Sequence, residues 1–312
     1  MTSYWEPRQP VDKKTLFDLA SLTKVLCTVG ILGRAFDKKM FELDCVLEKM
    51  APEWGGTPYG NLKIAHLLNH CAGLKDWYPF YKEESWKETL LKNPSEFRVN
   101  SEKIASEYSD IGFLLLGSAI EGLFQKPLKE VFHQEVLQHF PKTDLQFGPV
   151  SNESVMATEW RIEKKSPLQG QSFDENTEAL GGVAPHAGLF GSAEGLLPIA
   201  KEWLLGWQGK SKWLTEKTVK TFTQRTRWIE GSSWALGWDT RSFQGSSAGS
   251  LFHEESFGHL GYTGTSLWID PIQKGICIFL TNRVHPSRID TRIRRIRPLV
   301  HDAVFKKWSG RE

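Results

Sequence analysis

The longest apolar stretch near the start of the chain covers residues 20–40 and predicts a buried helix. Its large apolar residues are spread around a helical wheel rather than along one stripe, and they are Leu22, Val25, Leu26, Val29, Ile31 and Leu32. A helix that is apolar on all sides is covered on all sides, so we expect this segment at the centre of the molecule. Residues 111–124 predict a second buried helix, and apolar periodicity predicts further helices over 128–140, 196–207 and 213–223.

The C-terminal part of the chain predicts antiparallel strands followed by a helix. Residues 265–269 and 275–281 are apolar runs joined by a turn at Asp270-Pro271, and a helix is expected over 290–308. Apolar and polar residues do not alternate in 275–281, which indicates a central strand that needs neighbours on both edges. The polar residues 1–14 have little strand propensity with which to fill the second edge. We therefore expect an exposed edge, with either a homodimer formed through it or low stability.

Composition and charge exclude several classes of partner. The 312 residues are 40% hydrophobic and 24% charged with a net charge of +2, which fits a globular chain and gives no reason to expect nucleic acid. No run resembles a signal peptide or a membrane span, so the chain as written is expected in the cytoplasm. A local excess of arginine is interpreted as the solvated, salt-bridging face of the terminal helix: Arg288, Arg292, Arg294, Arg295 and Arg297.

The tetrapeptide Ser21-Leu22-Thr23-Lys24 opens the first predicted helix and is the first candidate for chemistry. Residues three apart on a helix project from the same face, so the Ser21 hydroxyl and the Lys24 amine are expected side by side. An amine accepts the proton of a serine only if burial has lowered its own pKa, and the apolar flanks supply that burial. The alternative is a helix-capping serine followed by a surface lysine.

Tyr108-Ser109-Asp110 precedes the second buried helix. Either Ser109 or Asp110 can cap that helix, which is a sufficient structural reason for the pair. Tyr108 then lies on the loop before the helix, where its phenol can face a cleft. His66 and His70 are four residues apart, but no third ligand accompanies them, and we expect neither a metal nor another cofactor.

A third motif, His259-Leu260-Gly261, precedes the predicted hairpin, and the three motifs in this order resemble the serine β-lactamase and penicillin-binding protein superfamily. Two further phrases, 66–74 and 280–286, are similar to its class C-related serine hydrolases. The resemblance runs from residue 16 to about 308. It implies an α+β fold, an α/β sandwich on an antiparallel sheet with an inserted helical lobe. We expect one domain over 1–312, with the helical lobe at about 41–170 and the sandwich at about 15–40 and 171–312.

The same resemblance implies roles for individual residues. Ser21 becomes the nucleophile, Lys24 its activating amine, and Tyr108 the general base for acylation and deacylation, with a pKa lowered by Lys24. The oxyanion hole would be the backbone N–H groups of Ser21 and Tyr262. The substrate-binding residues would be Asp110, His259, Gly261, Asp174 and Asn176.

The chain departs from the family pattern in two places. Relatives that handle β-lactams or peptidoglycan usually carry lysine and a hydroxyl residue where this chain has His259 and Leu260. A mostly neutral histidine and a leucine weaken the recognition of an anionic substrate, which favours an esterase or amidase for small or apolar acyl groups. The resemblance also leads one to expect a helix and a hairpin before Ser21. Either a start upstream has been missed, in which case any signal peptide would lie in the missing part, or the fold is trimmed at its N-terminus.

We therefore predict a serine hydrolase that forms an acyl-enzyme at Ser21 on a small ester, amide or peptidoglycan-like substrate. The alternative is a family member that has lost turnover and acts as a binding or regulatory protein.

Overall fold

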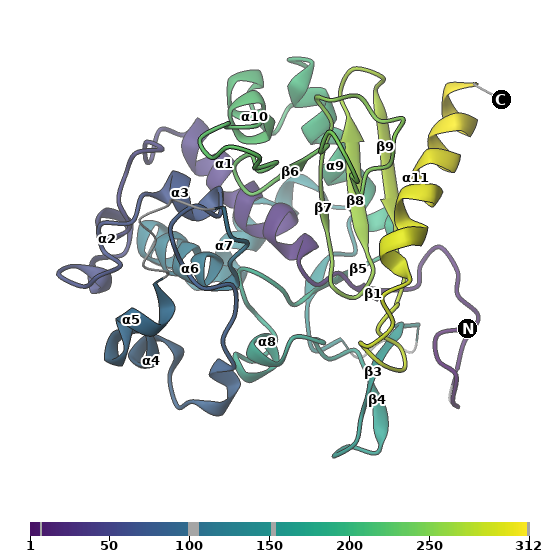
Figure 1. Cartoon of the computed structure of the whole chain (residues 1–312), viewed down its shortest axis with the longest axis horizontal. Coiled ribbons are helices and arrows are strands. Elements are labelled where there is room, and N and C mark those ends of the chain that lie inside the picture. The colour runs from purple at the N-terminus through teal and green to yellow at the C-terminus, as the bar shows by residue number, and fades with distance from the viewer. Residues whose placement is uncertain (7, 99–105, 151–153, 311–312) are drawn as a thin grey trace.

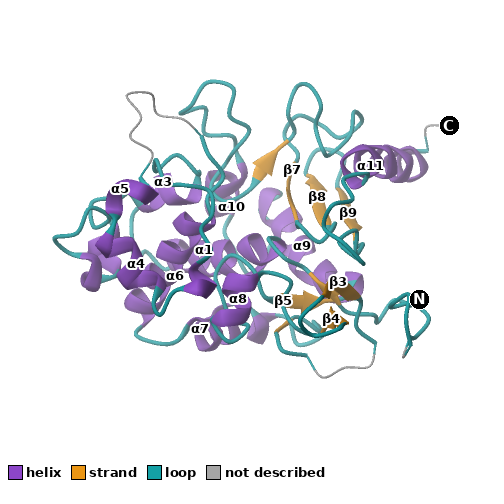
Figure 2. Ribbon diagram, turned by 60° about the horizontal axis from the view of Figure 1, so that its bottom comes forward, coloured by secondary structure: helices purple, strands orange, loops and turns teal. Residues whose placement is uncertain are grey.

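Most helices gather on one side of the molecule, and the short antiparallel sheets lie on the other together with the C-terminal helix (Figures 1 and 2). The computed structural model describes residues 1–312 except 7, 99–105, 151–153 and 311–312. The described strands form a three-stranded sheet (β1-β5-β2), a two-stranded sheet (β3-β4) and a four-stranded sheet (β6-β7-β8-β9), in which neighbours pair antiparallel. The predicted α+β class is confirmed.

The α-helices of the described chain are α1 (Val29–Asp37), α2 (Leu47–Met50), α3 (Ile64–Leu68), α4 (Trp86–Lys92), α5 (Pro94–Phe97), α6 (Asp110–Phe124), α7 (Leu128–Glu135), α8 (Glu175–Ala179), α9 (Ala193–Trp207), α10 (Glu216–Thr223) and α11 (Ile293–Ser309). A π-helical turn covers Lys24–Thr28, and 3₁₀ turns cover Pro52–Trp54, Phe80–Lys82 and Leu137–His139.

The strands are β1 (Phe17–Asp18), β2 (Gln146–Phe147), β3 (Ala157–Arg161), β4 (Ser166–Gln169), β5 (Leu189–Gly191), β6 (Asp239–Thr240), β7 (Phe257–Leu260), β8 (Ser266–Asp270) and β9 (Gly275–Phe279). The expected hairpin is therefore present as β8 and β9.

The first predicted helix is the centre of the packing. It is helical from Leu22 onward and contains the π-helical turn before α1. All six apolar residues named for it are completely buried, and it contacts α6, α7 and α10. An apolar helix surrounded by other helices holds its polar residues in fixed positions, so the two polar side chains at its start have little freedom.

Helices α9 and α11 both contact the last strand, β9. Trp308 of α11 lies where a side chain at Gly275 would stand, with ring atoms 2.1 Å from an ideal Cβ. The strand is thus covered as its apolar sequence predicts. In the described chain, β9 ends its sheet, with a strand partner on one edge only. It is therefore not a central strand here, and its second edge lacks a strand partner, as expected of the edge that residues 1–14 cannot fill.

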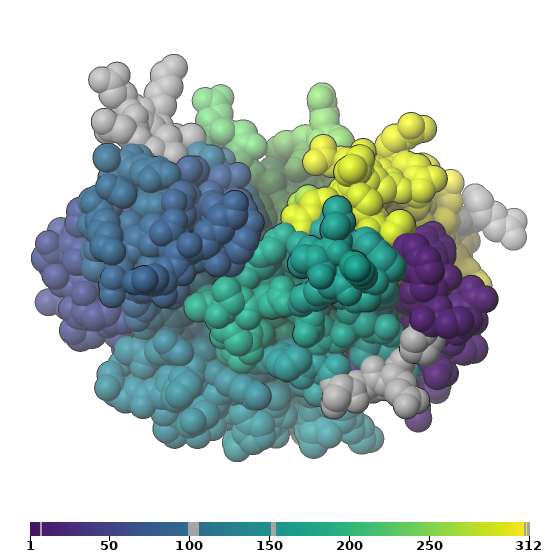
Figure 3. All heavy atoms as spheres, turned by 90° about the horizontal axis from the view of Figure 1, so that it is seen from below, coloured from purple at the N-terminus to yellow at the C-terminus, as the bar shows by residue number. Residues whose placement is uncertain are grey.

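The N-terminal residues pack elsewhere (Figure 3). The N–H of Ala157 donates to the carbonyl of Thr2, and the ring of Trp5 packs against that of Trp160 with 4.7 Å between their centres, so this segment lies against β3. A homodimer through the edge of β9 remains a prediction. The division into a helical lobe (41–170) and a sandwich lobe also remains a proposal, and strands β2, β3 and β4 fall within 41–170.

Within the described residues, no helix is both long and apolar enough to cross a bilayer.

Candidate active site

Ser21 is presented by a turn that the preceding residues hold in place. Ala20 has a φ of 46°, a left-handed conformation that is uncommon for a residue with a side chain. The Asp18 carboxylate accepts the N–H of Ala20 at 2.8 Å and that of Phe173 at 2.6 Å. The turn therefore links β1 to the start of the central helix and leaves Ser21 partly exposed.

Lys24 is completely buried and stands beside Ser21, as predicted. Its Nζ donates to Ser21 Oγ at 3.2 Å and to the carbonyl of His186 at 3.1 Å, and it lies 2.6 Å from Asp110 Oδ1. The alternative of a surface lysine is excluded. The three contacts use all three protons of an ammonium group, which is the arrangement expected of a charged lysine.

Tyr108 and Asp110 approach the same amine from the start of α6. Ser109 is the residue that caps this helix, because its Oγ accepts the N–H of Gly112 at 3.0 Å. Asp110 is thereby left to pair with Lys24, whose Nζ is also 4.9 Å from the centre of the Tyr108 ring. Two of the three motifs thus meet at one point.

The protonation states differ from those expected. Burial alone would lower the pKa of Lys24, but the charges of Asp110 and Tyr108 outweigh it and raise the pKa above its usual value. Burial raises the pKa of Tyr108 to about 12, although Lys24 opposes that rise. The predictions of a lowered pKa for Lys24 and for Tyr108 are both wrong. Burial, with the charge of Asp110 as a smaller contribution, raises the pKa of Tyr108, and the charges of Asp110 and Tyr108 raise that of Lys24.

The turn after β7 brings the third motif to Ser21. Thr263 and Thr265 donate to the carbonyls of Asp18 and Leu19 at 2.7 and 3.1 Å. An ideal Cβ on Gly261 would lie 2.0 Å from Thr265 Oγ1, so only glycine fits this contact. Among the described residues, no acceptor is bound by the N–H of Ser21 or of Tyr262. The two expected oxyanion donors, the N–H groups of Ser21 and Tyr262, lie on two segments that the hydrogen bonds of Thr263 and Thr265 hold together.

His259 does not replace the expected cation of the third motif. It is 2% exposed, and burial, with the charge of Lys24 second, lowers its pKa to about 3. Its Nδ1 lies 2.8 Å from the carbonyl of Leu260, so the ring carries its proton there and Nε2 is an acceptor. Nε2 is buried and has no partner in the described chain. His259 thus offers the cleft a hydrogen-bond acceptor.

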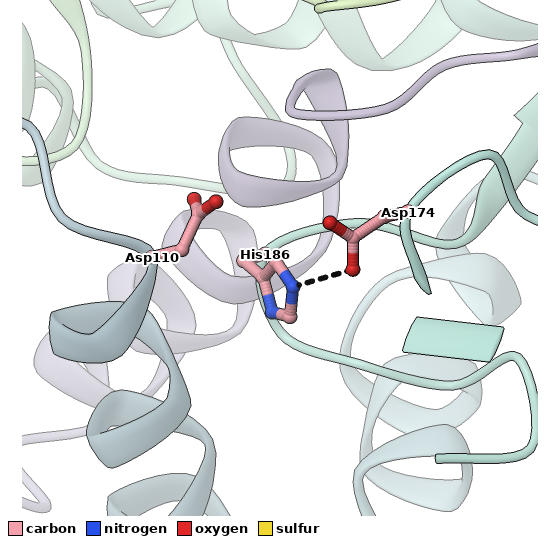
Figure 4. Close-up of side chains that lie close together, drawn as sticks. All are labelled: Asp110, Asp174 and His186. Carbon is pink, nitrogen blue, oxygen red and sulfur yellow. Dashed lines mark hydrogen bonds and ion pairs between the residues drawn. The ribbon is translucent and has the colours of Figure 1, made fainter. Parts of the chain in front are cut away.

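Asp174 and His186 form a pair next to Asp110, as Figure 4 shows. His186 Nε2 lies 3.1 Å from Asp174 Oδ1, and the same oxygen accepts the N–H of Thr177 at 2.7 Å. The pKa of Asp174 is lowered despite its burial, because His186 and Thr177 stabilise its charge. The ligand atoms of Asp110, Asp174 and His186 lie within 4.8 Å of one another. Lys24 already neutralises Asp110, so we interpret this cluster as a polar support for the amine.

Asn176 has a different position from the one expected. Its amide donates to the carbonyl of Tyr78 at 2.8 Å and accepts the N–H of Tyr81 at 3.0 Å. It therefore fixes the 78–81 segment and is absent from the lining of the cleft.

The cleft itself has a volume of about 350 Å³ and is lined by Ser21, Tyr108, His259, Gly261 and Tyr262. It brings together residues from both ends of the chain.

Comparisons with known proteins place this geometry in a family. The family model described as beta-lactamase matches residues 2–301. The chain belongs to the beta-lactamase family. A putative D-alanyl-D-alanine carboxypeptidase of Escherichia coli (strain K12) is 28% identical over an alignment 321 residues long, gaps included, and the alignment covers 90% of this chain and 73% of the relative.

Solved structures agree with this beta-lactamase family fold. EstCE1, a hydrolase with promiscuous acyltransferase activity, has a TM-score of 0.72 and 19% identity over 96% of this chain and 87% of its own. A penicillin-binding protein homologue from Caulobacter crescentus has a TM-score of 0.70 and 17% identity over 97% of this chain and 87% of its own. The resemblance to β-lactamases and penicillin-binding proteins is confirmed.

The sequence did not predict several residues of this beta-lactamase family site. Trp234 and Asp239 line the cleft, and Trp234 packs 5.6 Å from the ring of Tyr108. Burial raises the pKa of Asp239 to about 6 although it accepts a hydrogen bond from Ser233. The carbonyl of His186, which accepts a hydrogen bond from Lys24, belongs to the backbone, so no side chain in the sequence signals it.

Four arginines also line the cleft: Arg283, Arg288, Arg294 and Arg297. The predicted salt bridges are present for Arg288, which pairs with Glu159 and Glu175 at 2.6 Å, and for Arg292, which pairs with Asp290. Both residues lie before α11, however, and not on a face of the helix as predicted. The prediction of a solvated side chain is wrong for Arg297, which is 6% exposed.

Proposed function

We propose that this member of a serine hydrolase family cleaves an ester or amide through an acyl-enzyme at Ser21. The observation that carries the proposal is the convergence of Ser21, Lys24 and Tyr108, with a buried Lys24 Nζ 3.2 Å from Ser21 Oγ. A hydroxyl, an amine and a phenol placed together at the wall of a cleft are the groups that acyl transfer requires. The carboxypeptidase name of the relatives adds acyl-peptides to the candidate amides.

The acylation step starts when Tyr108 has lost its proton. The phenolate takes the proton of the Ser21 hydroxyl while Oγ attacks the carbonyl carbon of the substrate. The charged Lys24 stabilises both the phenolate and the developing alkoxide, and the N–H groups of Ser21 and Tyr262 receive the oxyanion. The tetrahedral intermediate then expels the leaving group, which takes the proton from Tyr108, and the acyl group stays on Ser21.

Deacylation repeats these steps with water. Tyr108 takes a proton from the water while the water oxygen attacks the acyl carbonyl. Tyr108 then passes this proton to Ser21 Oγ as the ester bond breaks. The acid product leaves and the site is restored. Because Tyr108 has a pKa of about 12 in the resting site, the active form is a minor one at neutral pH.

A Tyr108 that keeps its proton at neutral pH favours one alternative to the hydrolase: a family member that binds its substrate and turns it over slowly or not at all. Hydrolysis of 4-nitrophenyl butanoate by purified variants separates the two. We expect Ser21→Ala and Lys24→Ala to lower kcat at least about a thousandfold. Tyr108→Phe is expected to lower kcat by about a hundredfold or more, since it removes a general base.

Lys142→Ala is the control, since Lys142 is exposed and outside the cleft; it should retain full activity. Turnover of Lys24→Ala near that of the natural chain would contradict the mechanism. If the natural chain does not cleave 4-nitrophenyl butanoate, the result would favour the alternative, a family member that binds its substrate without turning it over.

A further inference from the structure

Another pocket lies on the opposite side of β6 from the catalytic cleft. Its volume is about 240 Å³, and it is lined by residues at the end of α10, in β6 and in the loop that follows β6. Successive side chains of a strand point to opposite faces, so Asp239 lines the cleft and Thr240 lines this pocket. Pockets for drug-sized ligands have volumes of about 300–1,000 Å³, so this one suits a smaller molecule.

Two half-buried arginines give the pocket a fixed positive charge. Arg225 Nε donates to Thr240 Oγ1 at 2.8 Å, and its Nη2 donates to the carbonyl of Arg241 at 2.6 Å. Arg241 Nη2 donates to the carbonyl of Ser250 at 3.1 Å, while its Nε is buried and has no partner in the described chain. Among the described residues, neither guanidinium forms an ion pair with a carboxylate. Neutral groups therefore hold both cations in place and leave their charges for a ligand.

Glu254 and Glu255 bring negative charge to the same pocket. In the part of the chain that the structure describes, neither carboxylate forms an ion pair, with these arginines or with the exposed Arg227 that also lines the pocket. A plain anion such as phosphate would be attracted by the arginines but repelled by both glutamates. A small molecule that carries one charge of each sign matches the pocket better.

Phe243 adds an apolar surface to the wall of the pocket. Its side chain is 76% exposed, and the centre of its ring lies 5.1 Å from the guanidinium carbon of Arg225. An apolar group of a ligand that covered this ring would remove apolar area from water, which is favourable. The pocket thus combines cations, carboxylates and an apolar ring.

We propose that this pocket binds a free α-amino acid with an apolar side chain. Arg225 and Arg241 receive its carboxylate through charge-assisted hydrogen bonds. Glu254 and Glu255 receive its ammonium group, and its side chain packs against the exposed phenylalanine ring. The inference goes beyond the proposed function, because this site lies outside the cleft of Ser21 and binds its ligand without breaking a bond.

Calorimetric titration of the full chain with leucine and its one-charge analogues tests the proposal. 4-Methylpentanoate lacks the ammonium group of leucine, 3-methylbutylamine lacks its carboxylate, and inorganic phosphate represents a plain anion. We expect one enantiomer of leucine to bind with a Kd of about 1 mM or lower, and each of the other three probes to bind at least about tenfold more weakly. Catalytic activity does not enter the measurement, so an inactive chain can still be tested.

Arg241→Gln and Glu254→Gln should each weaken the binding of leucine about tenfold, because each removes one of the two charges that the ligand needs. Arg295→Gln and Glu163→Gln are the matched controls, since both residues are exposed and lie outside the pocket; leucine should bind to them as to the natural chain. Glu254→Gln keeps the test valid if Arg241→Gln does not fold, because an exposed side chain contributes little to folding.

Three results would overturn the proposal. The first is that neither enantiomer of leucine binds to the folded chain. The second is that 4-methylpentanoate or phosphate binds as tightly as leucine, which would indicate a site for plain anions. The third is that leucine binds to Glu254→Gln as tightly as to the natural chain.

Discussion

At the scale of single residues, Asp110 is the charge that raises the pKa of both Lys24 and Tyr108. Its Oδ1 lies 2.6 Å from Lys24 Nζ, and its charge contributes to the raised pKa of both Lys24 and Tyr108. Burial disfavours the charged form of both groups, the ammonium and the phenolate. It therefore lowers the pKa of Lys24 and raises the pKa of Tyr108. Only the negative neighbour makes both groups hold their protons more tightly.

Asp110→Asn should therefore move the pH profile of kcat/KM. The natural chain is expected to become more active as pH rises, because the active form has lost the proton of Tyr108. Removal of the charge lowers the pKa of Tyr108 and of Lys24, so the rising limb should shift to lower pH by about one unit or more. The measurement is kcat/KM for phenyl butanoate across the pH range in which the protein stays folded.

Asp302→Asn serves as the control, since Asp302 binds the backbone of Ser250 and Leu251 away from the cleft. A limb that stays in place in Asp110→Asn would show that Asp110 does not control this proton.

The juxtaposition of Ser21, Lys24 and Tyr108 could be predicted from motifs, whereas their protonation could not. The spacing of Ser21 and Lys24 along a helix determines that they lie together. The pKa values depend on Asp110 and on the degree of burial, which are properties of the assembled site. The same holds for His259, whose single proton is placed by the carbonyl of Leu260.

Two turns position the catalytic groups at the scale of elements. One holds Ser21 between β1 and the central helix, and the other joins β7 to β8 and carries Gly261 and Tyr262. Hydrogen bonds from Thr263 and Thr265 to the chain before Ser21 connect the two turns. The π-helical turn at Lys24–Thr28 lies between them and the straight part of the helix, as is frequent at functional sites.

Gly261→Ala should separate these turns. A Cβ would lie 2.0 Å from Thr265 Oγ1 and 2.6 Å from the carbonyl of Leu19, so the β7–β8 turn must move and carry the Tyr262 N–H with it. Loss of one oxyanion donor is worth about a hundredfold or more in kcat. We expect a fall of that size in ester hydrolysis while the protein still unfolds cooperatively on heating.

Gly33→Ala is the matched glycine control in α1, because its Cβ would make ordinary contacts from 3.4 Å outward. Full activity of Gly261→Ala would place the oxyanion elsewhere.

The helices and the hairpin could be predicted because their apolar patterns are long and regular, as for α6 and β8. The unpaired edge of β9 could also be predicted, because residues 1–14 have little strand propensity with which to fill it. The cover that α9 and α11 give this strand could not be assigned to particular helices from its apolar sequence.

The cleft is a property of the whole molecule. It combines Ser21 from the start of the chain, Tyr108 from the loop before α6, the turn after β7 and arginines near the end. The order of the three motifs predicted the first three of these. Arg297 was misjudged because a run of arginines near a terminal helix gives no sign of which of them are buried and which face a cleft.

The central claim is that this assembled cleft makes Ser21 a nucleophile. A fluorophosphonate reacts with activated serines and leaves a stable adduct, so intact-mass measurement followed by peptide mapping tests the claim directly. We predict one adduct per chain, located on Ser21 and strongly reduced in Lys24→Ala, with the folded state of each protein checked by thermal unfolding. A folded chain that acquires no adduct, or acquires it on another residue, would contradict the claim.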